Sequence, residues 1–245
     1  PIDDLTLSLK AQIQPLIKEV VNKVFFYGAG VSSEKNQEVI KTAFREFFPN
    51  AAIEIGWDLL AAARALCGTD PGIACILGTG SNSCLYDGEK ITGNVANLGW
   101  ILADEGSGAY IGKLLVVDYL REKMPPHLSE KFAARYPLPR EEILARVYQQ
   151  ERPSAFLAGF SKFLFDNLND PWCYQLVYNS FCAFYENTVM KYPNYHSLPV
   201  HFVGSIGFYF SDLLRQVAHD KGITVKHILE GPIAGLTLYH QKDLS

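Results

Sequence analysis

Residues 78–81 (Gly78-Thr79-Gly80-Ser81) form a segment whose composition suits the binding of an anion. Glycines allow a tight turn whose amide N–H groups can point at a phosphate, and the hydroxyls of Thr79 and Ser81 are further donors. The segment is not a Walker loop, because it lacks the Gly-Lys-Ser/Thr sequence that enters a helix. It joins two apolar runs, so a plain glycine hairpin turn is the alternative interpretation.

Asp58 follows a short apolar run and precedes an Ala- and Leu-rich stretch. An aspartate at the end of a strand can accept the proton of a substrate hydroxyl as that hydroxyl attacks a γ-phosphate. Aspartate is also a common residue at the start of a helix, so a structural role as a helix cap stays open.

Gly99-Trp100 and the segment Asp104-Glu105-Gly106-Ser107-Gly108 combine an aromatic ring with carboxylates. An indole face can pack on the C–H surface of a sugar ring, while carboxylates accept hydrogen bonds from sugar hydroxyls. The alternative is that Asp104 and Ser107 cap the helix that follows.

Gly204-Ser205-Ile206-Gly207 follows an apolar run and precedes a helical pattern. A strand that passes through glycine into a helix lets a nucleotide approach its backbone closely. Many α/β turns share this composition, so the signal is weak alone.

The surrounding pattern predicts an α/β protein with parallel strands over its first part. Residues 3–22 carry a helix-period stripe that Pro15 interrupts. The final helix begins at Gly231-Pro232, and the region 105–192 is expected to be mostly helical, with core aromatics on residues 172–192. Strands are expected at 24–27, 52–55, 73–77, 83–86, 90–93, 200–203 and 223–225.

Composition excludes several classes of function. The chain is 48% hydrophobic with a formal net charge of −4, which is typical of a globular protein and unfavourable for nucleic-acid binding. No apolar run approaches the roughly 20 residues of a membrane span. The five cysteines include no Cys-x-x-Cys pair, which indicates free thiols in a reducing compartment. We therefore expect a cytoplasmic protein without nucleic-acid or membrane partners.

In their order, the four segments resemble the actin-like ATPase superfamily, and most closely its N-acetylglucosamine kinase and benzoyl-CoA-reductase-activator branch, the BadF/BadG/BcrA/BcrD family. Residues 75–83 are similar to the second phosphate motif of that branch, residues 99–107 to its sugar-binding segment, and 203–205 to its adenosine motif. Asp58 occupies the place of the catalytic aspartate. The resemblance covers nearly the whole chain.

The resemblance implies two ribonuclease-H-like domains around a cleft. Residues 1–68, with the C-terminal helix 232–245, would be the remainder of the first domain, and residues 69–231 would be the second domain with a helical insertion. The opening strands and first phosphate motif of the family are expected to precede Pro1, so the resemblance identifies no metal ligands.

The resemblance also implies a site for ATP, Mg²⁺ and an amino sugar. Asp58 would contact the sugar hydroxyl and act as general base. The remaining implied contacts are Ser81, Asn82, Gly99, Trp100 and Asp104 for the sugar, Gly78, Thr79 and Gly80 for the phosphates, and Gly204 and Ser205 for the nucleoside.

The expected reaction is transfer of the γ-phosphate of ATP to the primary hydroxyl of N-acetylglucosamine, which forms the 6-phosphate. One alternative is an ATPase that activates a partner reductase, which would need cysteines for a shared iron–sulfur cluster. Another is a sugar sensor without turnover. Whether the protein forms a homodimer stays open.

Overall fold

The structure, a computed structural model, describes residues 11, 13–31 and 33–241 of the 245-residue chain. Contacts divide the chain into two compact units between Ala61 and Ala62. We call them the first and the second unit and describe each by itself. The expected domain boundaries and the cleft stay predictions.

The first unit is a β-α-β arrangement. Strands β1 and β2 pair in parallel, with Val24 opposite Ile53 and Phe26 opposite Ile55. The ring of Phe44, in the connecting helix, packs 5.2 Å from that of Phe26 and anchors a small apolar core. The elements of this unit are η1 (Gln14–Leu16), β1 (Lys23–Gly28), α2 (Glu34–Phe47), β2 (Ala52–Trp57) and the start of α3 (Asp58–Cys67).

The break expected at Pro15 in the helix-period stripe of residues 3–22 is confirmed, but the stripe forms no α-helix after it. Residues 1–10 and 12 lie outside the described residues, and the chain forms only the short 3-10 turn Gln14–Leu16 before it continues without helix to β1. Leu16 and Val20 are exposed, so the apolar stripe gains no burial that would offset the helix break at Pro15.

The second unit is built on a five-stranded sheet in the order β5-β4-β3-β6-β7. Strand β4 is antiparallel to β3 and β5, whereas β6 is parallel to β3 and to β7. The hairpin expected at Asp87-Gly88 is confirmed, because the Asp87 carboxylate accepts hydrogen bonds from the N–H groups of Glu89 and Lys90. The strands are β3 (Gly72–Leu77), β4 (Ser81–Tyr86), β5 (Ile91–Gly93), β6 (Val200–Val203) and β7 (Val225–Leu229).

The last strand begins later than the sequence predicts. We expected residues 223–225, but β7 spans Val225–Leu229. Gly222 has a left-handed φ of +67°, and the N–H of Ile223 bonds to the carbonyl of Ala218. These residues close the end of the preceding helix and are therefore not available to the strand.

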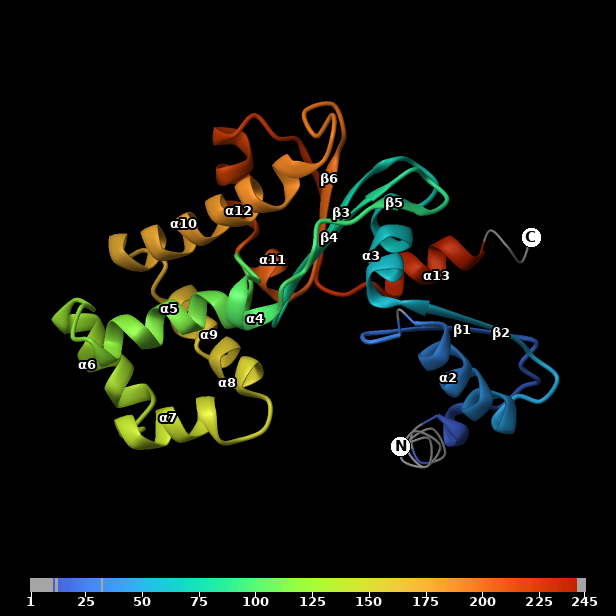
Figure 1. Ribbon diagram of the computed structural model, residues 1–245, viewed down its shortest axis with the longest axis horizontal. Coiled ribbons are helices and arrows are strands. Elements are labelled where there is room, and N and C mark those ends of the chain that lie inside the picture. The colour runs from blue at the N-terminus through green and yellow to red at the C-terminus, as the bar shows by residue number, and fades with distance from the viewer. Residues whose placement is uncertain (1–10, 12, 32, 242–245) are drawn as a thin grey trace. The chain divides into compact units, whose positions relative to one another are not determined.

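Helices cover the sheet of the second unit on both sides. In Figure 1, α5 to α10 lie on one side of the sheet, and α3 with α13 lies on the other. The prediction that residues 105–192 are mostly helical is confirmed. The helices are α4 (Gly99–Leu102), α5 (Gly108–Leu120), α6 (Pro126–Arg135), α7 (Arg140–Tyr148), α8 (Pro153–Gly159), α9 (Ser161–Asp166), α10 (Pro171–Asn187), η2 (Val189–Lys191), α11 (Ser205–Tyr209), α12 (Ser211–Asp220) and α13 (Ile233–Gln241).

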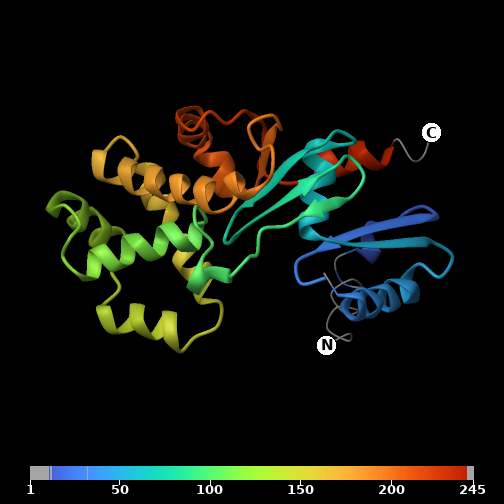
Figure 2. The ribbon, with the colours of Figure 1, turned by 45° about the horizontal axis from the view of Figure 1, so that its top comes forward.

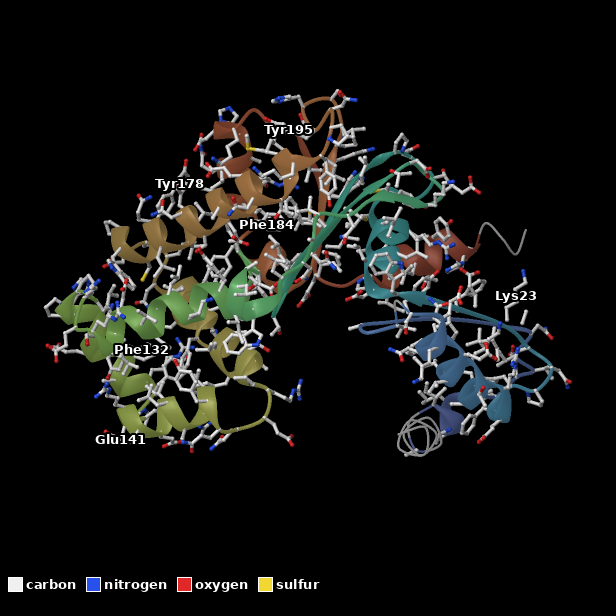
Figure 3. The ribbon with its side chains drawn as sticks, viewed as in Figure 1. Lys23, Phe132, Glu141, Tyr178, Phe184 and Tyr195 are labelled. Carbon is white, nitrogen blue, oxygen red and sulfur yellow. The ribbon has the colours of Figure 1, made fainter. Side chains whose placement is uncertain are left out.

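The main core lies between the sheet and the helices α5–α10. Ile73, Cys75 and Leu77 alternate along β3 and are fully buried in this core. Phe132 of α6 and Phe184 of α10, both labelled in Figure 3, belong to it as well. The prediction that Phe181, Phe184 and Tyr185 of α10 are core residues is therefore confirmed.

Helix α13 packs against α3. A Cβ atom on Gly235 would lie 2.4 Å from the carbonyl oxygen of Ala65, so only glycine permits this approach. The guanidinium of Arg64 lies over the Tyr239 ring, 5.2 Å from its centroid. The two helices lie side by side in Figures 1 and 2. Residues 242–245 of the expected helix lie outside the described residues.

The crossing of α5 and α8 generates a stability prediction. A Cβ on Gly112 of α5 would lie 1.9 Å from the carbonyl oxygen of Leu157, a backbone atom that cannot move aside alone. We expect Gly112→Ala to lower the free energy of unfolding by about 1–3 kcal/mol through overpacking, measured by denaturant unfolding. Gly159→Ala is the control, because its Cβ would meet nothing within 4 Å. Equal stability of the two variants would contradict this account.

Candidate functional site

Two glycine turns meet at one edge of the sheet in the second unit. Strands β3 and β6 are parallel neighbours, with Ile76 opposite Val203, so both end at the same edge. A Cβ on Gly204, whose φ is +122°, would lie 2.4 Å from the carbonyl oxygen of Leu77. The turn predicted to hold phosphates and the turn predicted to hold the nucleoside are therefore in contact through backbone atoms.

The first turns of α5 hold the phosphate-type turn. The N–H groups of Gly108 and Ala109 donate to the carbonyls of Gly78 and Thr79, at 2.8 and 3.0 Å. Within the turn, the N–H of Gly78 donates to the carbonyl of Gly80 at 3.0 Å. The N–H groups of Thr79 and Gly80 have no partner among the described residues, which leaves two donors for an anion.

The start of α5 agrees in part with the alternative that Asp104 and Ser107 cap this helix. The Ser107 side chain caps α5 by accepting a hydrogen bond from the N–H of Tyr110 at 3.2 Å. Asp104 does not share this role, since its side chain turns towards Gly80.

Asp104 is a buried carboxylate beside the glycine turn. Its side chain fills the space where a Cβ of Gly80 would lie, 2.8 Å from Oδ2, and only 8% of the residue is exposed. Oδ1 has no hydrogen-bond partner among the described residues. The backbone φ of +60° is rare for a residue other than glycine.

The surroundings of Asp104 act on its pKa in opposite directions. Burial raises the pKa of the carboxyl most strongly, and the nearby Glu105 raises it further. The backbone N–H of Ser81 and the charge of Lys113 lower it. A buried acid with one unpaired oxygen is poised to accept a hydrogen bond from a ligand.

A solvent-open polar pocket lies beside this carboxylate. It brings together Ser81, Asn82 and Asp104, three of the five residues predicted to line the sugar. The full lining is Ser81, Asn82, Ser83, Val95, Ala96, Asn97, Leu98, Ala103, Asp104, Glu105 and Thr188.

Two asparagines of the loop after β5 shape the pocket, and our sequence predictions do not include them. Asn97 donates through Nδ2 to the carbonyl of Ser81 and accepts through Oδ1 from the N–H of Gly99, both at 2.7 Å. Asn94 donates to the carbonyl of Ser83 at 2.6 Å and to Oδ1 of Asn82 at 3.2 Å. Two amides in one short loop beside a predicted site are the signal that could have identified them.

Residues distant in sequence hold three of the pocket residues, Glu105, Ser83 and Val95, in place. Glu105 accepts a hydrogen bond from the Asn187 side chain at 3.0 Å. The Tyr192 hydroxyl lies 2.7 Å from the Ser83 hydroxyl and accepts from the N–H of Val95 at 3.1 Å. No local sequence pattern indicates these pairs.

Among the described residues, the pocket lining includes neither Gly99 nor Trp100. The Trp100 ring packs against the main core and is partly buried there. Its expected stacking on a sugar stays a prediction.

Asp58 lies in the first unit at the start of α3, as the sequence predicts. Its Oδ1 accepts a hydrogen bond from the N–H of Leu59 at 2.9 Å. Burial raises the pKa of the Asp58 carboxyl, and this hydrogen bond lowers it in part. The Asp58 carboxylate therefore makes a local contact with the backbone at the start of α3, and this contact does not depend on a catalytic role.

The nucleoside-type turn leads into exposed aromatic residues that the sequence predictions also do not include. Phe208 and Tyr209 follow Ser205 on α11, and both are exposed. The Tyr209 hydroxyl donates to Glu230 at 3.0 Å, and its ring meets that of Phe165 edge-on at 5.8 Å. Exposed aromatic faces beside a nucleotide-type turn are suited to stacking with a base.

The described residues contain no group of three His, Cys, Asp or Glu side chains that could hold a metal ion. No helix among them has both the length and the apolar character needed to cross a bilayer.

No family model and no curated protein matches this sequence. Solved structures do match it. The putative N-acetylglucosamine kinase from Porphyromonas gingivalis is 41% identical, with a TM-score of 0.94, over 99% of this chain and 86% of that one. A putative N-acetylglucosamine kinase from Chromobacterium violaceum (17% identity, TM-score 0.74, 97% of this chain, 85% of that one) shares the fold. These findings confirm the resemblance seen in the sequence: the chain belongs to the same family as the Porphyromonas gingivalis protein and has the fold of the actin-like ATPases.

Proposed function

We propose that this protein is an ATP-dependent sugar kinase that converts N-acetylglucosamine to its 6-phosphate. The observation that carries the proposal is the polar pocket in which the Asp104 carboxylate, whose Oδ1 is unpaired among the described residues, lies directly against Gly80 of the phosphate-type turn. A sugar that bonds to this carboxylate would lie next to the group that holds the phosphates. The 41% identical protein from Porphyromonas gingivalis, a putative N-acetylglucosamine kinase, supports the same substrate class.

The sugar end of the proposed site is the pocket itself. Asp104 and Glu105 would accept hydrogen bonds from sugar hydroxyls, while Ser81 and Asn82 can donate or accept. Trp100 and Gly99 belong to the proposed site through the family resemblance. The preference for an N-acetyl group is part of the proposal and is tested by comparing sugars.

The nucleotide end of the proposed site is the pair of glycine turns. The unpartnered N–H groups of Thr79 and Gly80 would bind phosphate oxygens, with Gly78 shaping the turn. Gly204 and Ser205 would approach the nucleoside, and the exposed ring of Tyr209 would support its base.

We propose Asp58 as the general base. The primary hydroxyl of the sugar would give its proton to the Asp58 carboxylate as the oxygen bonds to the γ-phosphorus. The bond between that phosphorus and the β,γ-bridging oxygen would break, and ADP would leave. The raised pKa of Asp58 brings it nearer to that of an effective base at neutral pH.

Magnesium fits this proposal as an ion that arrives with the nucleotide. Mg²⁺ is commonly held by one or two carboxylates together with substrate phosphates and water, so a three-residue protein cluster is not required. When bound, it would neutralise phosphate charge.

The alternative of a reductase activator is less well supported. Such a protein needs thiols at a surface where two subunits share a cluster. Cys67, Cys75 and Cys84 are all buried, and burial raises the pKa of the Cys67 and Cys84 thiols to about 12. Buried thiols of high pKa are poor cluster ligands.

The proposal is tested by phosphorylation assays on the full-length protein with ATP, Mg²⁺ and a panel of sugars. We expect ADP release that depends on sugar, with N-acetylglucosamine as the preferred acceptor and its 6-phosphate as the product. Sugar-independent ATP hydrolysis would favour the activator. Tight sugar binding without turnover would favour a sensor.

Asp58→Asn tests the general base. We expect kcat to fall by about 10²–10⁴-fold because the proton acceptor is lost, while ATP binding measured by calorimetry stays close to that of the wild type. Asp170→Asn is a matched control, since Asp170 also starts a helix, where it accepts a hydrogen bond from Trp172. A similar loss of activity in both variants would show that Asp58 is only a helix cap.

Asp104→Asn tests whether the buried charge of the Asp104 carboxylate lowers the stability of the folded protein. We expect the variant to lose most sugar phosphorylation. We also expect its free energy of unfolding to increase by about 1 kcal/mol, which corresponds to a rise in Tm of roughly 2–4 °C. Asparagine carries no buried charge and tolerates the left-handed φ of +60°.

The gain in stability of Asp104→Asn should depend on pH. The pKa of Asp104 is raised in the folded state, so protonation at low pH removes the cost of the buried charge. The gain should therefore be smallest at low pH and largest above the raised pKa. An asparagine variant that is less stable than the wild type at neutral pH would contradict this account.

A further inference from the structure

Helix α4 (Gly99–Leu102) begins at a glycine and ends just before the pocket acid Asp104, and it buries little apolar surface. Leu98, Ile101 and Leu102 are 58, 69 and 76% exposed, and of its apolar side chains only Trp100 packs against the main core. Both Gly99 and Asp104 have positive φ values, of +74° and +60°. Hydrophobic burial therefore contributes little to the position of this segment.

A lysine from α5 supplies a polar anchor instead. The Lys113 ammonium donates to the carbonyl of Trp100 at 3.0 Å and lies 3.5 Å from the carbonyl of Ile101. These carbonyls belong to the last turn of α4, where a helix favours a positive charge. The same ammonium also lies over the Tyr110 ring, 5.4 Å from its centroid, which adds a cation–π contact.

The charge of Lys113 also acts on the pocket. The charged groups that act on Asp104 are Glu105, from its own segment, and Lys113, from α5. Glu105 disfavours the ionised form of Asp104, and Lys113 favours it, so the two oppose one another. The N–H of Ser81, from β4, adds a hydrogen bond that favours the ionised form.

We propose that Lys113 is a positioning residue of the sugar site: by holding the Trp100 and Ile101 carbonyls, it fixes the segment that carries Asp104 into the pocket. The inference rests on the proposed function, because the pocket is the proposed sugar site. Lys113 itself does not line the pocket and has no part in the transfer of the phosphoryl group.

The test compares Lys113→Met with the wild-type full-length protein. Loss of hydrogen bonds from a charged group predicts a rise of about 10- to 100-fold in the KM for sugar, with a much smaller change in the KM for ATP. Without the lysine charge the pKa of Asp104 should rise, so the acid limb of kcat/KM for sugar should move to higher pH. Lys113→Arg should restore the pH limb and part of the sugar affinity, because it keeps the charge.

Lys162→Met is the matched control, since Lys162 is exposed and pairs only with Asp166 on its own helix among the described residues. It should leave both KM values and the pH profile unchanged. If Lys113→Met does not fold, Lys113→Gln removes the charge with a polar side chain and should show the same shift of the acid limb.

The outcomes separate this inference from the proposed function. An active wild type whose Lys113→Met or Lys113→Gln variant keeps the wild-type sugar KM and acid limb would overturn the role of Lys113 alone. Equal increases in the KM values for sugar and ATP would also overturn it, because they would indicate a general structural role. A wild type that phosphorylates no sugar would overturn the proposed function and, with it, this inference.

Discussion

At the end of β3, backbone atoms of different segments pack directly against one another, and the neighbouring elements of the second unit depend on this contact. Gly204 packs against Leu77 with no room for a Cβ, and the Asp104 carboxylate fills the space beside Gly80. The first two N–H groups of α5, from Gly108 and Ala109, donate hydrogen bonds to carbonyls of the same turn. Any side chain larger than hydrogen at Gly80 or Gly204 would separate elements that here lie in direct contact.

This arrangement places a polar group where it is unfavourable for folding. Asp104 is buried, its Oδ1 is unpaired among the described residues, and its backbone adopts a left-handed conformation. Each of these features lowers stability, and their combination is typical of functional sites rather than of core positions. The helical layer beneath, with its many buried aromatic rings, supplies the stability that tolerates them.

Much of the fold could be predicted because its signals are local. The glycine turns, the β-α-β order of the first unit and the aromatic face of α10 each depend on residues close in sequence. The apolar stripe of residues 3–22 does not continue as an α-helix after Pro15, because periodicity does not reveal whether a partner surface exists. The late start of β7 reflects the end of α12, because the hydrogen bond that closes this helix uses the N–H of the β-prone residue Ile223. The pocket was predicted only in part. Ser81, Asn82 and Asp104 belong to recognisable motifs, whereas the partners Asn187 and Tyr192 lie more than 80 residues away along the chain and become neighbours only through the fold.

Helix α5 has a geometric consequence for the two halves of the proposed site. Its first residue, Gly108, bonds to the glycine turn, and Lys113, five positions later, bonds to α4. At about 1.5 Å per residue, the helix separates these two attachments by roughly 7.5 Å along its axis. A single inserted residue between them would turn Lys113 by about 100° and carry its ammonium away from α4. The length of this helical segment therefore sets the spacing between the phosphate-type turn and the attachment of Lys113 to α4, and relatives that differ in that spacing should differ by whole turns of helix rather than by single residues.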